Sequence, residues 1–118
     1  MPLQVVGGTT PKSGISRLTT EFLYWTLTTS IDLSDANAEI AFIDDEQTKP
    51  SSQHWYVADI MPTPGDEDTP AVRILVGPEN GDADLTPPTS EQVVYYVWVK
   101  IIKDVETIVR RAGTLLVR

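Results

Sequence analysis

Three kinds of side chain in this sequence are able to take part in chemistry: one histidine, two acidic stretches, and a set of tryptophans and tyrosines. His54 is the sole histidine, and it opens a β-rich run beside Trp55. A catalytic triad needs a base, a group that orients it and a nucleophile in register, and the residues around His54 do not form that pattern. Metalloprotease, nucleophile-elbow and phosphate-cradling motifs are also missing from the sequence. We therefore expect a protein that is not an enzyme and uses no cofactor.

The acidic stretches 65–69 and 79–84 are the best candidates for binding a cation. Ca²⁺ takes several oxygen ligands, and neighbouring loops at one end of a β-sandwich are able to supply them. Neither stretch has the spacing of an EF-hand calcium loop. We expect solvated loops and no metal site, with calcium binding as the alternative. The carboxylates concerned are those of Asp66, Glu67, Asp68, Glu79, Asp82 and Asp84.

Composition restricts the classes of partner. The 118 residues fit one domain, and they include no cysteine that would form a disulfide or a thiolate metal site. With 17 acidic and 9 basic residues, the formal charge is −8, which disfavours nucleic acid and anionic membranes as partners. We see no signal peptide and no apolar run of about 20 residues that would span a bilayer. These features predict a soluble acidic domain.

Six β-rich runs, separated by turn-forming residues, predict an all-β protein. Between Leu23 and Thr28, apolar and polar side chains alternate with the period of two that a strand requires. Runs at this spacing, bounded by Pro, Gly, Asp and Asn, are typical of an antiparallel sandwich or barrel. We expect strands within 17–29, 38–44, 54–61, 71–77, 91–102 and 107–118, and connections at 31–37, 45–53, 62–70 and 78–90.

The first 16 residues differ from the rest, because glycine, proline and small polar residues surround one short apolar patch. Such a segment has too little apolar surface to pack alone. We therefore divide the chain into a flexible arm, 1–16, and a folded domain, 17–118. An arm of this kind adds a strand to a neighbour's sheet in some assemblies. Its contact candidates are Leu3, Val5 and Val6.

The stretch 104–112 fits two structures. Its apolar residues have helical spacing, with Asp104 as a plausible N-cap and Gly113 just beyond the end. The β-branched residues between 105 and 109, and the long strand before them, favour a final strand instead. We favour the strand and keep the helix as the alternative.

The tryptophans Trp25, Trp55 and Trp98 lie in the middle of predicted strands, where an aromatic residue is usually core or a cross-strand partner. Alternation along 95–101 places one set of side chains in the core and Trp98 on the opposite face. An outward tryptophan beside an apolar residue marks a contact surface, and the alternative is that a neighbouring loop or the amino-terminal segment partly covers it. On this face Trp98, Lys100 and Ile102 are the candidate partner-binding residues.

The last third of the chain resembles the closing strands of an immunoglobulin-like β-sandwich, with Tyr95 or Tyr96 in the position of the tyrosine corner. Residues 20–118 also resemble small virion proteins of tailed bacteriophages, especially those that infect actinobacteria. The most specific pieces are "ILVGPENG" (74–81), "YYVWVKI" (95–101) and "VRRAGTLLV" (109–117). The chain departs from that family before the final strand, where its relatives carry prolines and this sequence has none.

The resemblance implies an immunoglobulin-like fold and a structural role in the virion, with no catalytic residues to carry over. Proteins of this kind are encoded among head and head–tail genes. The implied function is a capsid decoration or head-associated protein, made in the host cytoplasm, that binds the major capsid protein or another virion protein and stabilises the capsid. Self-association into a homo-oligomer remains open. The alternative is a binding module of the tail tip, neck or fibre that recognises a protein or a carbohydrate through the loops around Asp66 and Asp82.

Overall fold

The chain was analysed as a computed structural model, which describes residues 4–8, 15–16, 18–29, 32–63, 65–78, 81–83, 85 and 92–118. Side chains are described for all of these except residues 4–8 and Asp66. The described part consists of β-strands and their connections and contains no helix. The strands are β1 (Gln4–Gly8), β2 (Glu21–Thr28), β3 (Asn37–Ile43), β4 (Trp55–Thr63), β5 (Asp66–Val76), β6 (Val93–Lys103) and β7 (Glu106–Val117).

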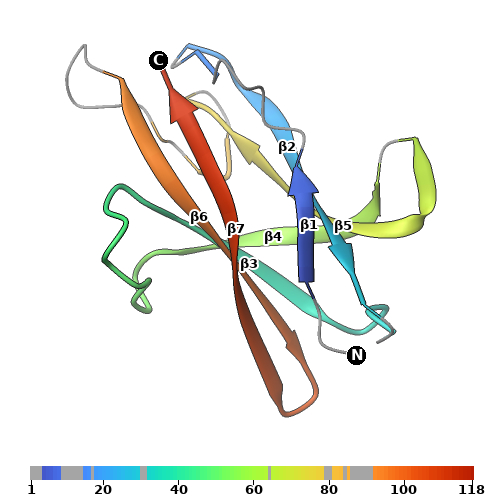
Figure 1. Cartoon of the computed structure of the whole chain (residues 1–118). Coiled ribbons are helices and arrows are strands. Elements are labelled where there is room, and N and C mark those ends of the chain that lie inside the picture. Colours follow the sequence, from blue (N-terminus) through green and yellow to red (C-terminus); the bar gives the residue numbers. More distant parts are fainter. Residues whose placement is uncertain are drawn as a thin grey trace.

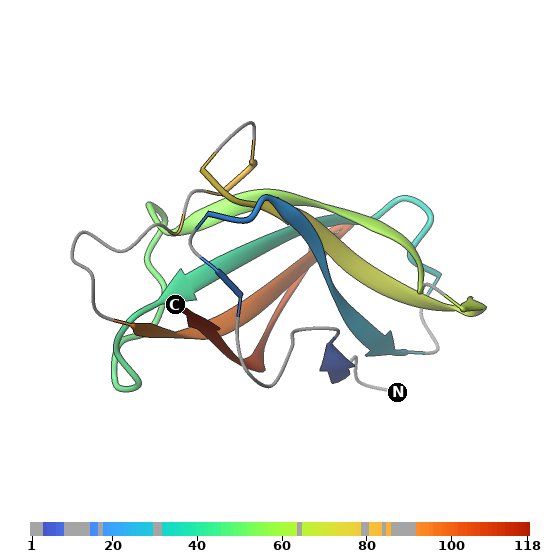
Figure 2. The ribbon, with the colours of Figure 1, turned by 90° about the horizontal axis from the view of Figure 1, so that it is seen from above.

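All the strand pairs are antiparallel, and the strands follow one another in the order β1-β2-β5-β4-β3-β6-β7. The sheet curls around its own core, so that β2 and β5 form one layer and β3, β6 and β7 the other (Figures 1 and 2). If the strands are lettered in chain order, the halves β1-β2-β5-β4 and β3-β6-β7 have the A-B-E-D and C-F-G orders of a constant-type immunoglobulin domain. The predicted all-β antiparallel fold is confirmed.

Strand β4 belongs to both halves, which joins them into one hydrogen-bonded sheet. Its first part, from Trp55 to Ala58, pairs with β3, and its second part, from Asp59 onward, pairs with β5. The expected sandwich of two separate sheets is therefore a single curled sheet in its hydrogen bonding.

The six predicted runs are all strands, but the expected loop at 62–70 needs correction. The segment 62–70 is no loop, because β4 continues to Thr63 and β5 begins at Asp66, with Gly65 in the turn at a φ of 83°. In the stretch 104–112, residues 104–105 form a turn and β7 begins at Glu106, so the favoured strand is confirmed and the helix is not formed. Lys103 pairs with Glu106, so the β6–β7 hairpin turns through only two residues, and Asp104 adopts a φ of 54°.

The amino-terminal segment is part of the fold, which corrects the expectation of a flexible arm over 1–16. Residues 4–8 form β1, which pairs antiparallel with β2 and lies beside β7 in Figure 1. Ile15 is buried and exchanges two backbone hydrogen bonds with the end of β7, at Leu116 and Arg118. Since β1 pairs with one half and Ile15 with the other, this segment links both layers.

The core lies between the two layers and is built from the alternate residues of each strand. Its largest member is Trp25, whose ring centroid is 6.1 Å from that of Phe42. Phe42 in turn contacts Tyr56 and Tyr95, so four strands contribute to one aromatic cluster. Val97, Val99 and Ile101 are buried as expected. The inward face predicted for β6 is therefore confirmed.

Of Tyr95 and Tyr96, which the sequence left open, Tyr95 makes a hydrogen bond of the kind that a tyrosine corner makes. Its hydroxyl donates a hydrogen bond to the carbonyl oxygen of Leu85 at 3.3 Å, and Leu85 belongs to the connection between β5 and β6. The ring packs edge-on against Phe42 at 6.5 Å. Tyr96 points to the opposite face. The hydroxyl of Tyr95 thus ties the β5–β6 connection to the core.

Replacing Tyr95 with phenylalanine is expected to lower the free energy of unfolding by about 1 kcal/mol, because a part-buried carbonyl loses its donor while the ring stays in place. Urea denaturation followed by tryptophan fluorescence measures this difference. Tyr96→Phe is the matched control, since it removes the same hydroxyl from the outer face. Equal stabilities of the two variants would contradict a structural role for the Tyr95 hydroxyl.

A β-bulge in β7 sets which of its side chains face outward. Val97 pairs with Gly113 but Trp98 pairs with Arg111, so Ala112 is the extra residue. A bulge shifts the alternation of side chains by one position. On one side of it Leu115 enters the core, and on the other Arg111 lies opposite the outward Trp98.

Candidate interaction surface

The outer face of β4, β3, β6 and β7 gathers aromatic rings and cations from three strands. Across the sheet, Trp55 pairs with Ala41, Ala41 with Trp98, and Trp98 with Arg111. Ala41 is fully buried although it lies outside the core cluster, so the bulky side chains beside it close over this position. We call this surface the cation–aromatic face and define it as Trp55, Tyr96, Trp98, Lys100 and Arg111.

The two cations of this face lie over its rings. Lys100 Nζ is 4.3 Å from the ring centroid of Trp55 and 3.7 Å from the carboxylate of Glu39. The guanidinium carbon of Arg111 is 4.6 Å from the ring centroid of Tyr96 and 5.8 Å from that of Trp98. Cations at these distances are attracted by the negative face of the ring. The contacts fix where the charges point, because each cation is held by a ring of another strand.

One polar atom of the cation–aromatic face lacks a partner. Trp98 Nε1 is buried and has no hydrogen-bond acceptor in the described part of the chain. A buried donor without an acceptor costs free energy, and such groups are uncommon in native proteins. Nearby, Val57 exposes 79% of its surface and Val109 exposes 38%. Apolar, aromatic and cationic groups therefore occur together on one sheet surface.

The structure places three of the six predicted contact residues on one side of β6. Trp98, Lys100 and Ile102 alternate with core residues and are all partly exposed, which confirms their predicted common face. Leu3 lies outside the described residues. The remaining two, Val5 and Val6, belong to β1, whose pairing is described without its side chains.

Sequence reasoning missed Tyr96, Trp55 and Arg111 as members of the face. Tyr96 follows directly from the alternation that identified Trp98. To predict Trp55 as a member of the face, the pairing of β4 with β3 has to be known. The alternation of side chains along one strand does not show which strand lies beside it. To predict Arg111 as a member of the face, the bulge at Ala112 has to be known. Strict alternation along the strand does not include the extra residue that a bulge inserts.

Of the acidic candidates for binding a cation, Glu79 and Asp84 lie outside the described residues, and Asp66 is described without its side chain. Glu67 and Asp68 are exposed on β5, and the backbone nitrogen of Asp82 donates to the carbonyl of Leu75 at 2.7 Å. No group of three or more histidine or acidic residues among those described is placed to hold a metal ion. His54 accepts a hydrogen bond at Nδ1 from the backbone nitrogen of Ser51 at 2.9 Å, within the turn before β4.

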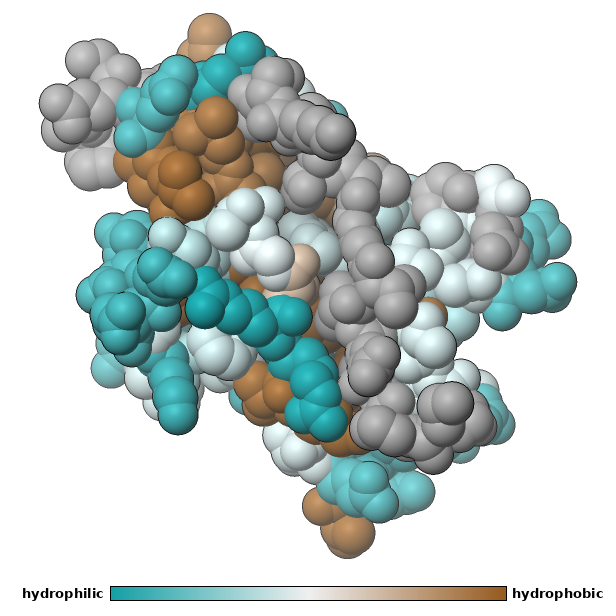
Figure 3. All heavy atoms as spheres, in the orientation of Figure 1, coloured by the Kyte–Doolittle hydropathy of each residue, from teal (hydrophilic) through white to brown (hydrophobic). Residues whose placement is uncertain are grey.

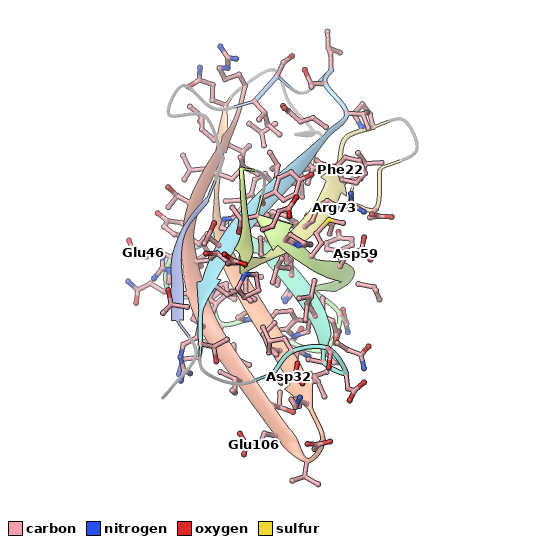
Figure 4. All side chains as sticks on the ribbon, turned by 90° about the vertical axis from the view of Figure 1, so that its right-hand side faces the viewer. Phe22, Asp32, Glu46, Asp59, Arg73 and Glu106 are labelled. Atoms are coloured by element: carbon pink, nitrogen blue, oxygen red, sulfur yellow. The ribbon has the colours of Figure 1, made fainter. Side chains whose placement is uncertain are left out.

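A third cation, Arg73, lies over an aromatic ring on the other outer face, formed by β2, β5 and β4. The guanidinium of Arg73 lies 4.1 Å from the ring centroid of Phe22, and one of its nitrogens is 3.2 Å from Asp59 (Figure 4). Burial lowers the pKa of Arg73, but hydrogen bonds with Asp59 and Tyr24 outweigh it and raise the pKa overall. This cation is already paired with a carboxylate on its own surface.

A hollow of about 250 Å³ lies beneath the tip of the β6–β7 hairpin, which projects from the body of the fold (Figure 1). Leu33, Ile101 and Ile108 give it an apolar lining, and Val105, which is 98% exposed, lies at its edge. In Figure 3 the lower end of the surface is mostly hydrophilic, with a small hydrophobic patch at its lowest point.

The hairpin is attached to the β2–β3 loop by Lys103, whose Nζ donates to the backbone carbonyl of Asp32. Asp32 and Glu106 both lie at this end of the molecule (Figure 4). Hydrogen bonds from the backbone and hydroxyl of Ser34 lower the pKa of Asp32, and the charge of Lys103 lowers it further.

Comparison with protein-family models, with curated proteins and with solved structures found no match. Within the residues that the structure describes, no helix is long and apolar enough to cross a membrane.

Proposed function

We propose that this chain is a structural protein of a tailed-bacteriophage virion, and that it is a capsid decoration protein that binds the major capsid protein through the cation–aromatic face. The proposal rests on two supports. The resemblance of 74–81, 95–101 and 109–117 to virion proteins indicates the assembly. The cation–aromatic face provides a surface suited to a protein partner.

The observation that carries the proposal is the chemistry of that face. Protein interfaces are enriched in tryptophan, tyrosine and arginine, and a few such residues account for most of the binding free energy. Here Arg111 of β7 lies over the rings of Tyr96 and Trp98 of β6. Val57 and Val109 are exposed on the same outer face. Paired strands and the bulge at Ala112 set the positions of these side chains, so a partner meets them already positioned.

The proposal is tested by mixing the purified protein with heads, tails and intact virions of the phage that encodes it. We expect saturable co-sedimentation with heads and virions, and immunogold label on the capsid surface. Label at the tail tip, neck or fibre would replace the proposal with the alternative of a tail-associated module. Absence of binding to every particle would reject a virion role.

The contact surface is tested with Trp98→Ala, which is expected to weaken head binding at least about tenfold, as truncation of a central interface tryptophan does. Phe22→Ala is the matched control, because Phe22 also lies under an arginine, on the other outer face. Melting curves verify that both variants are folded. Equal head binding by the two variants would exclude the cation–aromatic face as the contact. Truncating the amino terminus is unsuitable for this purpose, because it removes β1 and Ile15 from the fold.

A further inference from the structure

We infer that the cation–aromatic face binds an acidic segment of its partner, and that Arg111 is the residue that binds a carboxylate of that segment. The inference rests on the proposed function in one respect, because both assign the partner to the cation–aromatic face. It adds the chemistry of the partner, which the resemblance does not specify.

The charges of the chain are strongly segregated. Residues 100–118 contain five of the nine basic residues and only two of the seventeen acidic ones, a net charge of +3. Residues 1–99 contain four basic and fifteen acidic residues, a net charge of −11. The positive segment comprises the end of β6 and all of β7. A partner that docks on residues 100–118 meets the one basic stretch of an acidic protein. An acidic segment is attracted to this stretch and repelled by the acidic remainder of the chain.

Arg111 is the cation whose charge has no partner on its own surface. Lys100 lies 3.7 Å from Glu39, and Arg73 lies 3.2 Å from Asp59. In the part of the chain that the structure describes, no carboxylate lies within ion-pair distance of Arg111. Its side chain is exposed, and the rings of Tyr96 and Trp98 hold it in place. A guanidinium fixed in this way presents parallel N–H donors that match the two oxygens of a carboxylate.

The unpartnered Trp98 Nε1 is a second, independent indication that this face is completed by another molecule. The donor is buried beside Arg111 and lacks an acceptor in the described residues. A carboxylate that binds the guanidinium also brings acceptor oxygens close to the indole. Binding is therefore expected to change the environment of this indole more than that of Trp25, which is buried in the core.

The experiment uses the full chain labelled with ¹⁵N and an octaglutamate peptide as probe. We expect saturable shifts of the Trp98 indole N–H signal that weaken as salt is raised, and no saturable shift with an octalysine peptide. Arg111→Gln is expected to weaken octaglutamate binding about tenfold. Arg110→Gln is the matched control, because it removes the same charge from the neighbouring residue, which pairs with core-facing Val99 instead of Trp98.

The outcomes separate the inference from the proposed function. Equal weakening by the two arginine variants, or no saturable octaglutamate binding, overturns the inference, since only net charge would then matter. Tighter binding of an eight-residue oligothymidylate through Arg111 also overturns it in favour of a phosphate ligand. If heads bind the wild type and Arg111→Gln equally, the inference fails while the virion role stands. If octaglutamate binding depends on Arg111 but the protein binds no phage particle, the inference stands and the virion role is rejected.

Discussion

Replacing Trp25 with alanine is expected to lower the free energy of unfolding by about 3–5 kcal/mol, the usual cost of removing a large aromatic side chain from a core. Trp25 is only 1% exposed and contacts Phe42 from the opposite layer. The truncation leaves a cavity between the layers, because neighbouring strands hold their positions through the sheet. Chemical denaturation followed by circular dichroism measures the loss.

Leu18→Ala provides the control for that experiment. Leu18 is 83% exposed, so its truncation is expected to change the free energy of unfolding by less than about 0.5 kcal/mol. Trp25→Phe is expected to lie between the two, since it keeps an aromatic ring at the contact. A loss below about 1 kcal/mol for Trp25→Ala would show that the two layers do not pack through this residue.

Substituting Gly77 with alanine is expected to destabilise the fold by about 2–4 kcal/mol, through overpacking and backbone strain together. Gly77 directly follows β5 with a φ of 154°, and its backbone nitrogen donates a hydrogen bond to the carbonyl of Ala83 at 2.9 Å. A Cβ atom at this position would collide with the Oγ1 and Cα atoms of Thr20. Because one of the colliding atoms belongs to the backbone, a rotamer change alone does not relieve the contact.

Gly65→Ala separates strain from collision in the same denaturation experiment. Gly65 has a φ of 83°, but an added Cβ there meets nothing within 4 Å. Its substitution therefore costs only the conformational strain, about 1 kcal/mol. If both substitutions lower the free energy of unfolding equally, the collision with Thr20 adds nothing to the cost at Gly77.

The sequence predicted the strands well because their period of two is a local property. Leu23, Trp25 and Leu27 are all buried, as their alternation required. Strand β1 was missed because a short run followed by two glycines has no pattern of its own. It becomes a strand by pairing with β2, which is a tertiary effect. The 62–70 region was misassigned for a related reason, since prolines and acidic residues obscure two strands that a single tight turn joins.

The candidate surface was predicted only in part. Trp98, Lys100 and Ile102 follow from counting along β6, but the charges over the rings depend on residues from other strands. Arg110 and Arg111 are indistinguishable in the sequence. The bulge at Ala112 gives them different surroundings, with Arg111 over Tyr96 and Arg110 donating to the carbonyl of Val109. Such a one-residue irregularity leaves no periodic signal.

The shared strand β4 has a mechanical consequence. Its outward residues run from Trp55, at the edge of the cation–aromatic face, to Asp59, which pairs with Arg73 on the other outer face. A force applied at one face is therefore carried to the other along a single backbone. The two layers are unable to slide past each other along β4 without breaking its hydrogen bonds to β3 or to β5. Under tension, the domain is expected to unfold in a single cooperative step.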